Sequence, residues 1–257
     1  MTALRHTLYL TIRQVKAFVR QPWYVALTLS QPIIWLLLFG ALFKKVVEIP
    51  GFGAKSYITF LTPGIVVMSA MFSGGWSGMG MIDDLDRGVM DRFLVAPTNR
   101  GALMLGRIAP QVLTTIIQSL ILVGLALVVG AKFPGGAAGI VLLIVCAALL
   151  SVGFGMLSNG LALMLRREES VIAAVNFILL PLTFLSSAFL QQSLAPKWIQ
   201  VISKYNPANW AIQAGREALN KGSDWGFVMA HAGYLLAFAV VCAFLATRAF
   251  RSYQRSV

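Results

Sequence analysis

Six separate stretches of this sequence run for at least 20 residues without Asp, Glu, Lys or Arg. A helix rises about 1.5 Å per residue, so roughly 20 apolar residues cross a hydrocarbon core of about 30 Å. The sequence therefore predicts an all-α membrane protein with six transmembrane helices. These are residues 23–43, 57–80, 108–130, 140–165, 171–190 and 227–247.

The composition favours the same class. Of 257 residues, 58% are hydrophobic and 12% are charged, which is too apolar for a soluble domain of that length. The formal net charge is +12, but the basic residues lie in short segments between the apolar stretches. That distribution favours contact with membrane lipids and topogenic charge over nucleic-acid binding. No long linker interrupts the chain, so we expect a single membrane domain over residues 1–257.

The segment before the first apolar stretch has an amphipathic pattern. In residues 4–20, apolar side chains recur at helical spacing, and Arg5, Arg13, Lys16 and Arg20 follow the same spacing one residue later. A helix with this pattern lies in the membrane interface, with its arginines at the headgroups. Either it only anchors the chain, or it also contacts a cytoplasmic partner.

The segment before the last apolar stretch is too polar to span. Residues 194–222 combine charged side chains with the aromatic rings Trp198, Tyr205 and Trp210. Aromatic rings are typical of headgroup depth. We expect short re-entrant helices in the outer leaflet between the fifth and sixth spans.

The arginines indicate the orientation. With both termini in the cytoplasm, twelve of the thirteen arginines fall inside, and Arg216 is the exception. Because cytoplasmic loops carry an excess of basic residues, we expect a multi-pass protein with both termini cytoplasmic.

This sequence lacks the residues that several kinds of chemistry require. No G-x-x-x-x-G-K-[ST] phosphate-binding loop occurs, and the Gly-rich residues 73–80 resemble a helix-packing motif because Gly74 and Gly78 form a G-x-x-x-G pair. Cys146 and Cys242 lie within apolar stretches and indicate neither a disulfide nor a metal site. His231 is the one histidine inside a predicted span, and it lies near the outer end of that span. We expect no catalytic residues and no metal, and an ion-driven mechanism is disfavoured.

Residues 83–97 are the most polar loop between predicted spans. Asp83 and Asp84 favour a helix start, and Pro97 ends the run. Leu85, Val89, Arg92 and Phe93 fall on one helical face. Such a helix could dock in a cleft on another protein, while the alternative is a solvated loop that only joins two spans.

Two stretches resemble the permease subunits of type-2 ABC exporters, a family that includes daunorubicin-type drug exporters and nodulation lipo-oligosaccharide exporters. The first runs from Asp86-Arg87-Gly88 to Pro97 and on to Gly106-Arg107, and is similar to the family's cytoplasmic coupling segment. The second combines the Phe-Leu-Ser run of residues 184–186 with Tyr205-Asn206-Pro207. The resemblance covers nearly the whole chain.

The resemblance implies partners and a location. Known members pair two permeases, as a homodimer or with a close paralogue, with two copies of a separate ATP-binding cassette subunit. ATP and Mg would then be bound by that partner, with no cofactor in this chain. We expect a bacterial inner (plasma) membrane protein that contacts lipids and no nucleic acid.

The resemblance also implies three groups of site residues. Contact with the ATPase subunit is expected at Asp84, Asp86, Arg87, Arg92, Phe93, Arg13 and Arg20. A substrate path along the first, second and fifth spans is expected at Trp35, Trp76, Asn176, Phe177 and Phe184, although packing or lipid contact is an alternative for each aromatic ring. The outer re-entrant turn is expected at Asn206 and Pro207.

The predicted function is ATP-driven export of a hydrophobic or amphipathic drug or lipid by alternating access. One alternative is export of a polysaccharide or lipo-oligosaccharide within the same family. Two rivals are an ion-coupled secondary transporter, which would follow pH or sodium gradients, and a pore, which would conduct without a partner.

Overall fold

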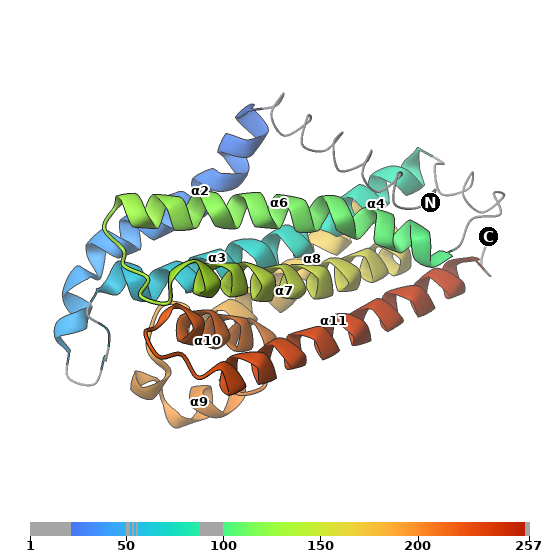
Figure 1. Cartoon of the computed structure of the whole chain (residues 1–257). Helices are drawn as coiled ribbons and strands as arrows, with labels where there is room; N and C mark the ends of the chain where they lie inside the picture. The colour runs from blue at the N-terminus through green and yellow to red at the C-terminus, as the bar shows by residue number, and fades with distance from the viewer. Residues whose placement is uncertain (1–21, 50–51, 53, 55, 88–99, 255–257) are drawn as a thin grey trace.

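The computed structural model describes residues 22–49, 52, 54, 56–87 and 100–254, and this part of the chain contains helices and no strand. The helices are α2 (Pro22–Leu42), α3 (Tyr57–Gly75), α4 (Ser77–Asp86), α6 (Arg100–Val128), α7 (Gly136–Leu165), α8 (Glu168–Phe184), α9 (Lys197–Ser203), α10 (Pro207–Leu219) and α11 (Trp225–Gln254), with 3₁₀ turns η1 (Lys44–Glu48) and η2 (Gln192–Leu194). Figure 1 shows α3, α6, α7 and α11 running lengthwise, with α9 and α10 gathered at one end of the bundle and α4 toward the other.

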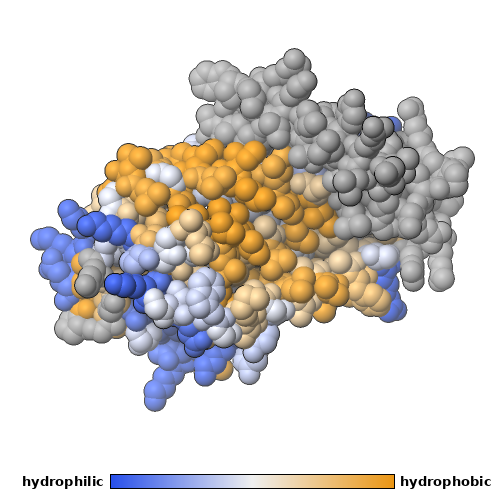
Figure 2. Space-filling view, in the orientation of Figure 1, coloured by the Kyte–Doolittle hydropathy of each residue, from blue (hydrophilic) through white to orange (hydrophobic). Residues whose placement is uncertain are grey.

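Four helical segments are long and apolar enough to cross a membrane, namely Tyr57–Asp86, Ile108–Val128, Gly136–Leu165 and Trp225–Phe250. They match four of the six predicted spans. The first predicted span contains the shorter apolar helix Leu27–Leu42, and the fifth contains α8, which is 17 residues long. Figure 2 shows a hydrophobic surface along the helices and hydrophilic residues near α9 and α10. The described part of the chain is therefore all-helical, and its long apolar helices are those of a multi-pass membrane protein, as predicted.

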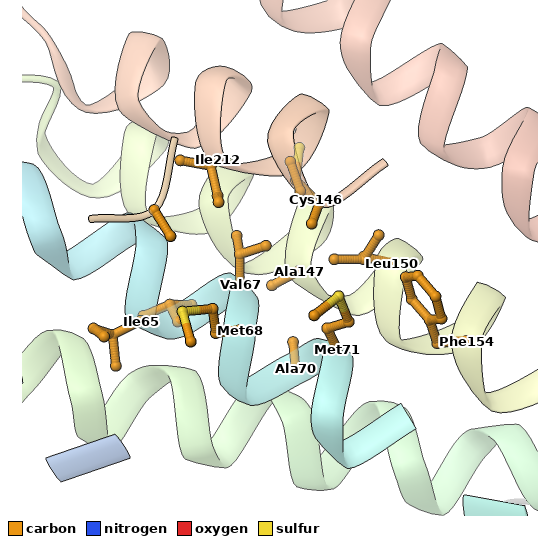
Figure 3. Close-up of a cluster of buried hydrophobic side chains, with 14 of the residues drawn as sticks. Ile65, Val67, Met68, Ala70, Met71, Cys146, Ala147, Leu150, Phe154 and Ile212 are labelled. Carbon is orange, nitrogen blue, oxygen red and sulfur yellow. The ribbon is translucent and has the colours of Figure 1, made fainter. Parts of the chain in front are cut away.

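Helix α7 is the centre of the packing. It contacts α3, α4, α6, α8, α10 and α11. Where α7 packs against α3, the side chains of Leu150 and Phe154 lie beside Met71 in the buried apolar cluster of Figure 3. Cys146 lies in the same cluster as a free, buried thiol, as expected for a small packing residue. Since most of the other helices rest on α7, its surface sets how the bundle assembles.

Glycines and hydroxyl groups bring α3 and α4 close to α7. A side chain at Gly74 would collide with the carbonyl oxygen of Ser151, and one at Gly78 would collide with Ser158. The Ser158 hydroxyl donates to the carbonyl oxygen of Gly75 and accepts the backbone N–H of Gly78 at 3.1 Å. Close backbones joined by hydrogen bonds are the usual way in which helices associate in lipid. The predicted packing role of the Gly74–Gly78 pair is confirmed.

The second predicted span is not one continuous helix. It breaks at Trp76, which separates α3 from α4, and α4 then continues to Asp86. The Trp76 backbone N–H bonds back to the carbonyl oxygens of Phe72 and Gly74, so the last turn of α3 tightens before the chain turns into α4. The prediction of a new helix starting at Asp83 is therefore wrong, because Asp83 lies in the last turn of α4. The rest of the predicted helix 83–97, from 88 on, and the predicted helix 4–20 lie outside the described residues.

The fifth predicted span ends earlier than expected. Helix α8 stops at Phe184 instead of continuing to Leu190. The Ser186 hydroxyl donates to the carbonyl oxygen of Thr183 at 2.6 Å, which offers the backbone an alternative to the next helical turn. Asn209 of α10 binds the next residue of the backbone, because the Ser187 N–H donates to its Oδ1 at 3.0 Å. The prediction of a helix through Leu190 is wrong for this reason.

Residues 194–222 form short helices, as predicted. Asn206 caps α10, because its Oδ1 accepts the backbone N–H of Ala208 at 2.9 Å, and Pro207 occupies the first turn, where its missing N–H costs nothing. The Asn206 side chain also donates to the carbonyl oxygen of Leu182 at 2.7 Å, which joins the turn to α8. Whether these helices re-enter the outer leaflet stays a prediction.

The contact at Gly74 gives a test of the packing. We expect Gly74→Ala to lower the free energy of unfolding by about 1–3 kcal/mol, because the added methyl group must push the α7 backbone away. The matched control is Gly124→Ala on α6, where a side chain would meet no atom within 4 Å. Thermal unfolding of both variants in detergent checks this, and equal midpoints would contradict the proposed role of this contact.

Candidate functional site

A cavity of about 1030 Å³ lies beside the central helix. Its walls come from α2, α3, α4, α6 and α8, and α7 contributes Asn159. Ligand sites for drug-sized molecules occupy roughly 300–1,000 Å³ and combine apolar walls with a few polar groups. The cavity is large enough for such a molecule.

Four aromatic rings line the cavity. Trp35 of α2, Phe72 of α3, Trp76 and Phe184 of α8 all line it. The Trp35 ring also packs against Phe189, with centroids 5.4 Å apart, so that neighbouring segment supports it. These large rings offer apolar surface to the body of an amphipathic molecule.

The α6 wall of the cavity is polar. Gln111, Thr114 and Gln118 line it at spacings of three and four residues, which places them on one helical face. The Gln111 amide donates to the carbonyl oxygen and the hydroxyl of Ser151, at 2.9 and 3.0 Å. The Thr114 hydroxyl donates to the carbonyl oxygen of Pro110 at 3.0 Å. Gln111 is therefore tied to α7, and Thr114 is tied to its own helix.

Gln118 and Asn159 differ from these side chains. Both are buried, with 6% and 4% of their surface exposed, and the Oε1 of Gln118 and the Oδ1 of Asn159 have no hydrogen-bond partner among the described residues. The Asn159 amide nitrogen donates to the carbonyl oxygen of Gly155 at 2.8 Å, so the orientation of that amide is fixed and its oxygen is the unpartnered atom. A buried oxygen without a donor costs about 1–3 kcal/mol.

The structure brings most of the predicted path residues to this cavity. Trp35, Trp76, Asn176 and Phe184 line it. Phe177 does not, and 81% of its surface is exposed. Its predicted place on the path therefore has no geometric support in this cavity, and its outward position agrees with the alternative of lipid contact.

The predicted ATPase contacts are described only in part. Asp86 and Arg87 are exposed at the end of α4, and Asp84, one turn away, lies on the cavity wall. Arg92, Phe93, Arg13 and Arg20 lie outside the described residues. The contact role of all seven residues stays a prediction.

At the α10 end of the bundle, one arginine joins three segments. The Arg216 Nε donates to the carbonyl oxygen of Phe60 at 3.1 Å, and its Nη2 donates to those of Ser187 at 2.6 Å and Ala188 at 3.2 Å. The guanidinium also lies 3.5 Å from the centre of the Phe60 ring. Burial lowers the pKa of Arg216 to about 9, so the group remains cationic at neutral pH. Carbonyl dipoles and a ring face thus surround this charge.

Sequence reasoning missed the α6 stripe and the role of Arg216. The stripe had a signal, since Gln111, Thr114 and Gln118 repeat at helical spacing within an otherwise apolar stretch. Arg216 had a weaker one, as the only arginine assigned to the outside. Its partners could not be predicted, because Phe60 and Ser187 are distant in sequence.

A helical bundle with several helices long enough to cross a membrane, and with an open drug-sized cavity beside them, fits a membrane transport protein. The ABC-2 type transporter family matches residues 5–220. The chain belongs to this family.

Curated relatives agree with this assignment. The daunorubicin resistance ABC transporter permease protein DrrB1 of Streptomyces coeruleorubidus is 27% identical over 242 residues, covering 93% of this chain and 84% of the relative. The putative transport permease ycf38 of Cyanophora paradoxa is 32% identical over 209 residues, covering 81% of this chain and 71% of the relative. The probable doxorubicin resistance permease DrrC of Mycobacterium tuberculosis (strain CDC 1551 / Oshkosh) is 21% identical over 183 residues, covering 71% and 66%. This chain is accordingly a transmembrane permease subunit of an ABC transporter.

The contacts of Arg216 predict its contribution to stability. Arg216→Ala should lower the free energy of unfolding by about 2–3 kcal/mol, because it removes charge-assisted hydrogen bonds between α10, α3 and the segment after α8. The control is Lys221→Ala, a nearby exposed position. Thermal unfolding of the two variants in detergent should separate them by several degrees. A loss no larger than that of the Lys221 variant would contradict the role given to these contacts.

Proposed function

We propose that this chain exports a hydrophobic or amphipathic small molecule, drug-like or lipid-like, with energy from a separate ATPase subunit. The cavity of about 1030 Å³ carries the proposal, because it joins aromatic rings and neutral polar groups within an apolar bundle. The names of the relatives that contain daunorubicin or doxorubicin resistance support the same substrate class and the outward direction.

The proposal includes a six-span topology. Helix α2, with its apolar part Leu27–Leu42, and helix α8 would complete the four longer spans. The hydrophilic surface near α9 and α10 supports an outer-leaflet, re-entrant place for these helices (Figure 2). The distribution of the arginines supports cytoplasmic termini, and the bacterial relatives support the inner membrane of a bacterium.

The proposed assembly contains two permeases, identical or paralogous, and two ATP-binding subunits that bind ATP and Mg. Asp86 and Arg87 are exposed at the end of α4, one turn or less from Asp84 on the cavity wall. An ATPase that docks there would contact the same helix that lines the cavity. Arg92, Phe93, Arg13 and Arg20 belong to this proposed contact surface by family resemblance.

The proposed mechanism is a shift between two membrane conformations. An ATPase can drive such a shift only if its ATP-bound form binds one conformation better than the other. Trp76, which separates α3 from α4, gives α4 a point about which it could move relative to α3. In the outward conformation, the cavity would open at the α10 end and release its substrate.

Charge reversal at the end of α4 tests the coupling. We expect the double variant Asp86→Arg and Arg87→Glu to reduce ATP-dependent efflux of the amphipathic dye rhodamine 6G from cells by at least tenfold, because like charges would face the docking site. The ATPase subunit is identified first, by its co-purification with the wild-type permease, and this co-purification should fall in parallel in the double variant. Lys197→Glu is the control, an exposed charge reversal on α9 at the other end of the bundle.

Unchanged efflux and unchanged co-purification in the double variant would refute the docking surface. Efflux that persists in cells depleted of ATP, and stops when the proton or sodium gradient is collapsed, would favour the ion-coupled rival. Dye flux with no ATPase present and in both directions would favour a pore.

A further inference from the structure

The cavity has two buried oxygens that the protein itself leaves without a partner. The Oε1 of Gln118 and the Oδ1 of Asn159 accept no hydrogen bond from any described residue, although both side chains lie in the cavity wall. Each buried acceptor disfavours the ligand-free state unless a donor reaches it. A transport protein gains affinity when its ligand supplies that donor.

The other two polar side chains of the α6 stripe already donate hydrogen bonds within the protein. Gln111 is bound to Ser151, and Thr114 is bound to Pro110. The terminal torsion of a glutamine is soft, so the Gln118 amide can turn toward a ligand without leaving its place on α6. Gln118 therefore differs from its two neighbours on the stripe in having a buried oxygen that no described residue reaches.

Charge narrows the class of ligand. Among the described residues that line the cavity, none is Lys, Arg or His, and the charged one is the carboxylate of Asp84. An anionic head group brought into an apolar site needs a cationic partner to offset the loss of water. An anion would meet no such partner in the described wall, whereas a head group with hydroxyl or amide N–H donors would meet acceptors.

We infer that Gln118 forms a polar subsite for an amphipathic molecule whose head group donates hydrogen bonds and carries no negative charge. Its apolar body would lie against the rings of Trp35, Trp76 and Phe184 on the same cavity. The inference rests on the proposed function, since it names the substrate class of that cavity. It places specificity on α6, beyond the first, second and fifth spans expected from the family resemblance.

Equilibrium binding to the purified full chain in lipid nanodiscs tests this subsite, with no ATP or ATPase present. The probes are three dansyl-labelled dodecyl amphiphiles that differ only in the head, which is a glucoside, the same glucoside with its hydroxyls methylated, or a sulfate. We expect the glucoside to bind saturably. The methylated probe should bind roughly fivefold more weakly, because it loses one neutral hydrogen bond, and the sulfate probe should show no saturable binding.

The variant Gln118→Leu separates a binding role from a structural one. It should weaken glucoside binding roughly fivefold and remove the difference between the glucoside and its methylated form. Its thermal midpoint should be unchanged or higher, because a buried acceptor without a partner is replaced by an apolar side chain. The control is Thr247→Val on α11, whose hydroxyl is already bound to the carbonyl oxygen of Ala243 at 2.7 Å and which does not line the cavity.

Equal binding of the sulfate and glucoside probes would overturn the inference, as would wild-type affinity in Gln118→Leu or the absence of saturable binding by the wild-type chain. The efflux assay with the ATPase is separate. Binding with this selectivity but without ATP-dependent efflux would refute the proposed function and leave the subsite in place. ATP-dependent efflux without this binding selectivity would support the proposed function and refute the subsite.

Discussion

Contact between α7 and its neighbours is the constraint on which the rest of the bundle depends. In lipid, helices gain no hydrophobic energy by meeting, so they associate through close packing and hydrogen bonds. Ser151 and Ser158 of α7 supply these contacts, facing Gly74 and Gly78 on α3 and α4 and, through Ser151, the amide of Gln111 on α6. One helix with small and hydroxyl-bearing residues thus fixes the positions of three others, and α10 and α11 also pack against it.

The cavity follows from this arrangement. Because α3, α4 and α6 are held against α7, the faces that they turn away from it meet α2 and α8 across an open space. Helix α6 therefore has a packing role and a cavity role. Its Gln111 is bonded to α7, while Gln118, two turns further along, has an oxygen without a partner among the described residues. Arg216 holds the α10 end by linking α3 and the segment after α8, so any opening of the bundle at that end would have to release or move these contacts.

Much of the fold could be predicted from the sequence, because length and the absence of charge determine where a helix can cross lipid. Four spans depend on local sequence and were predicted. The turn at Asn206 and Pro207 was expected from the family resemblance, and in the structure it caps α10. The break at Trp76 and the end of α8 at Phe184 were not predicted, since they depend on hydrogen bonds and contacts that hydropathy does not record. Four of the five path residues lie on the cavity. Gln118 and Asn159 were not predicted, because they lie in the third and fourth predicted spans, whereas the path was expected along the first, second and fifth.

The central claim is that energy for transport comes from a partner and acts on the cavity of this chain. Reconstitution of the purified permease and its ATPase in proteoliposomes measures this directly, with rhodamine 6G accumulation followed after ATP is added. The account predicts accumulation that requires both proteins and ATP and is unaffected when ion gradients are dissipated. Accumulation driven by the permease alone, or ATP hydrolysis by the permease alone, would contradict it.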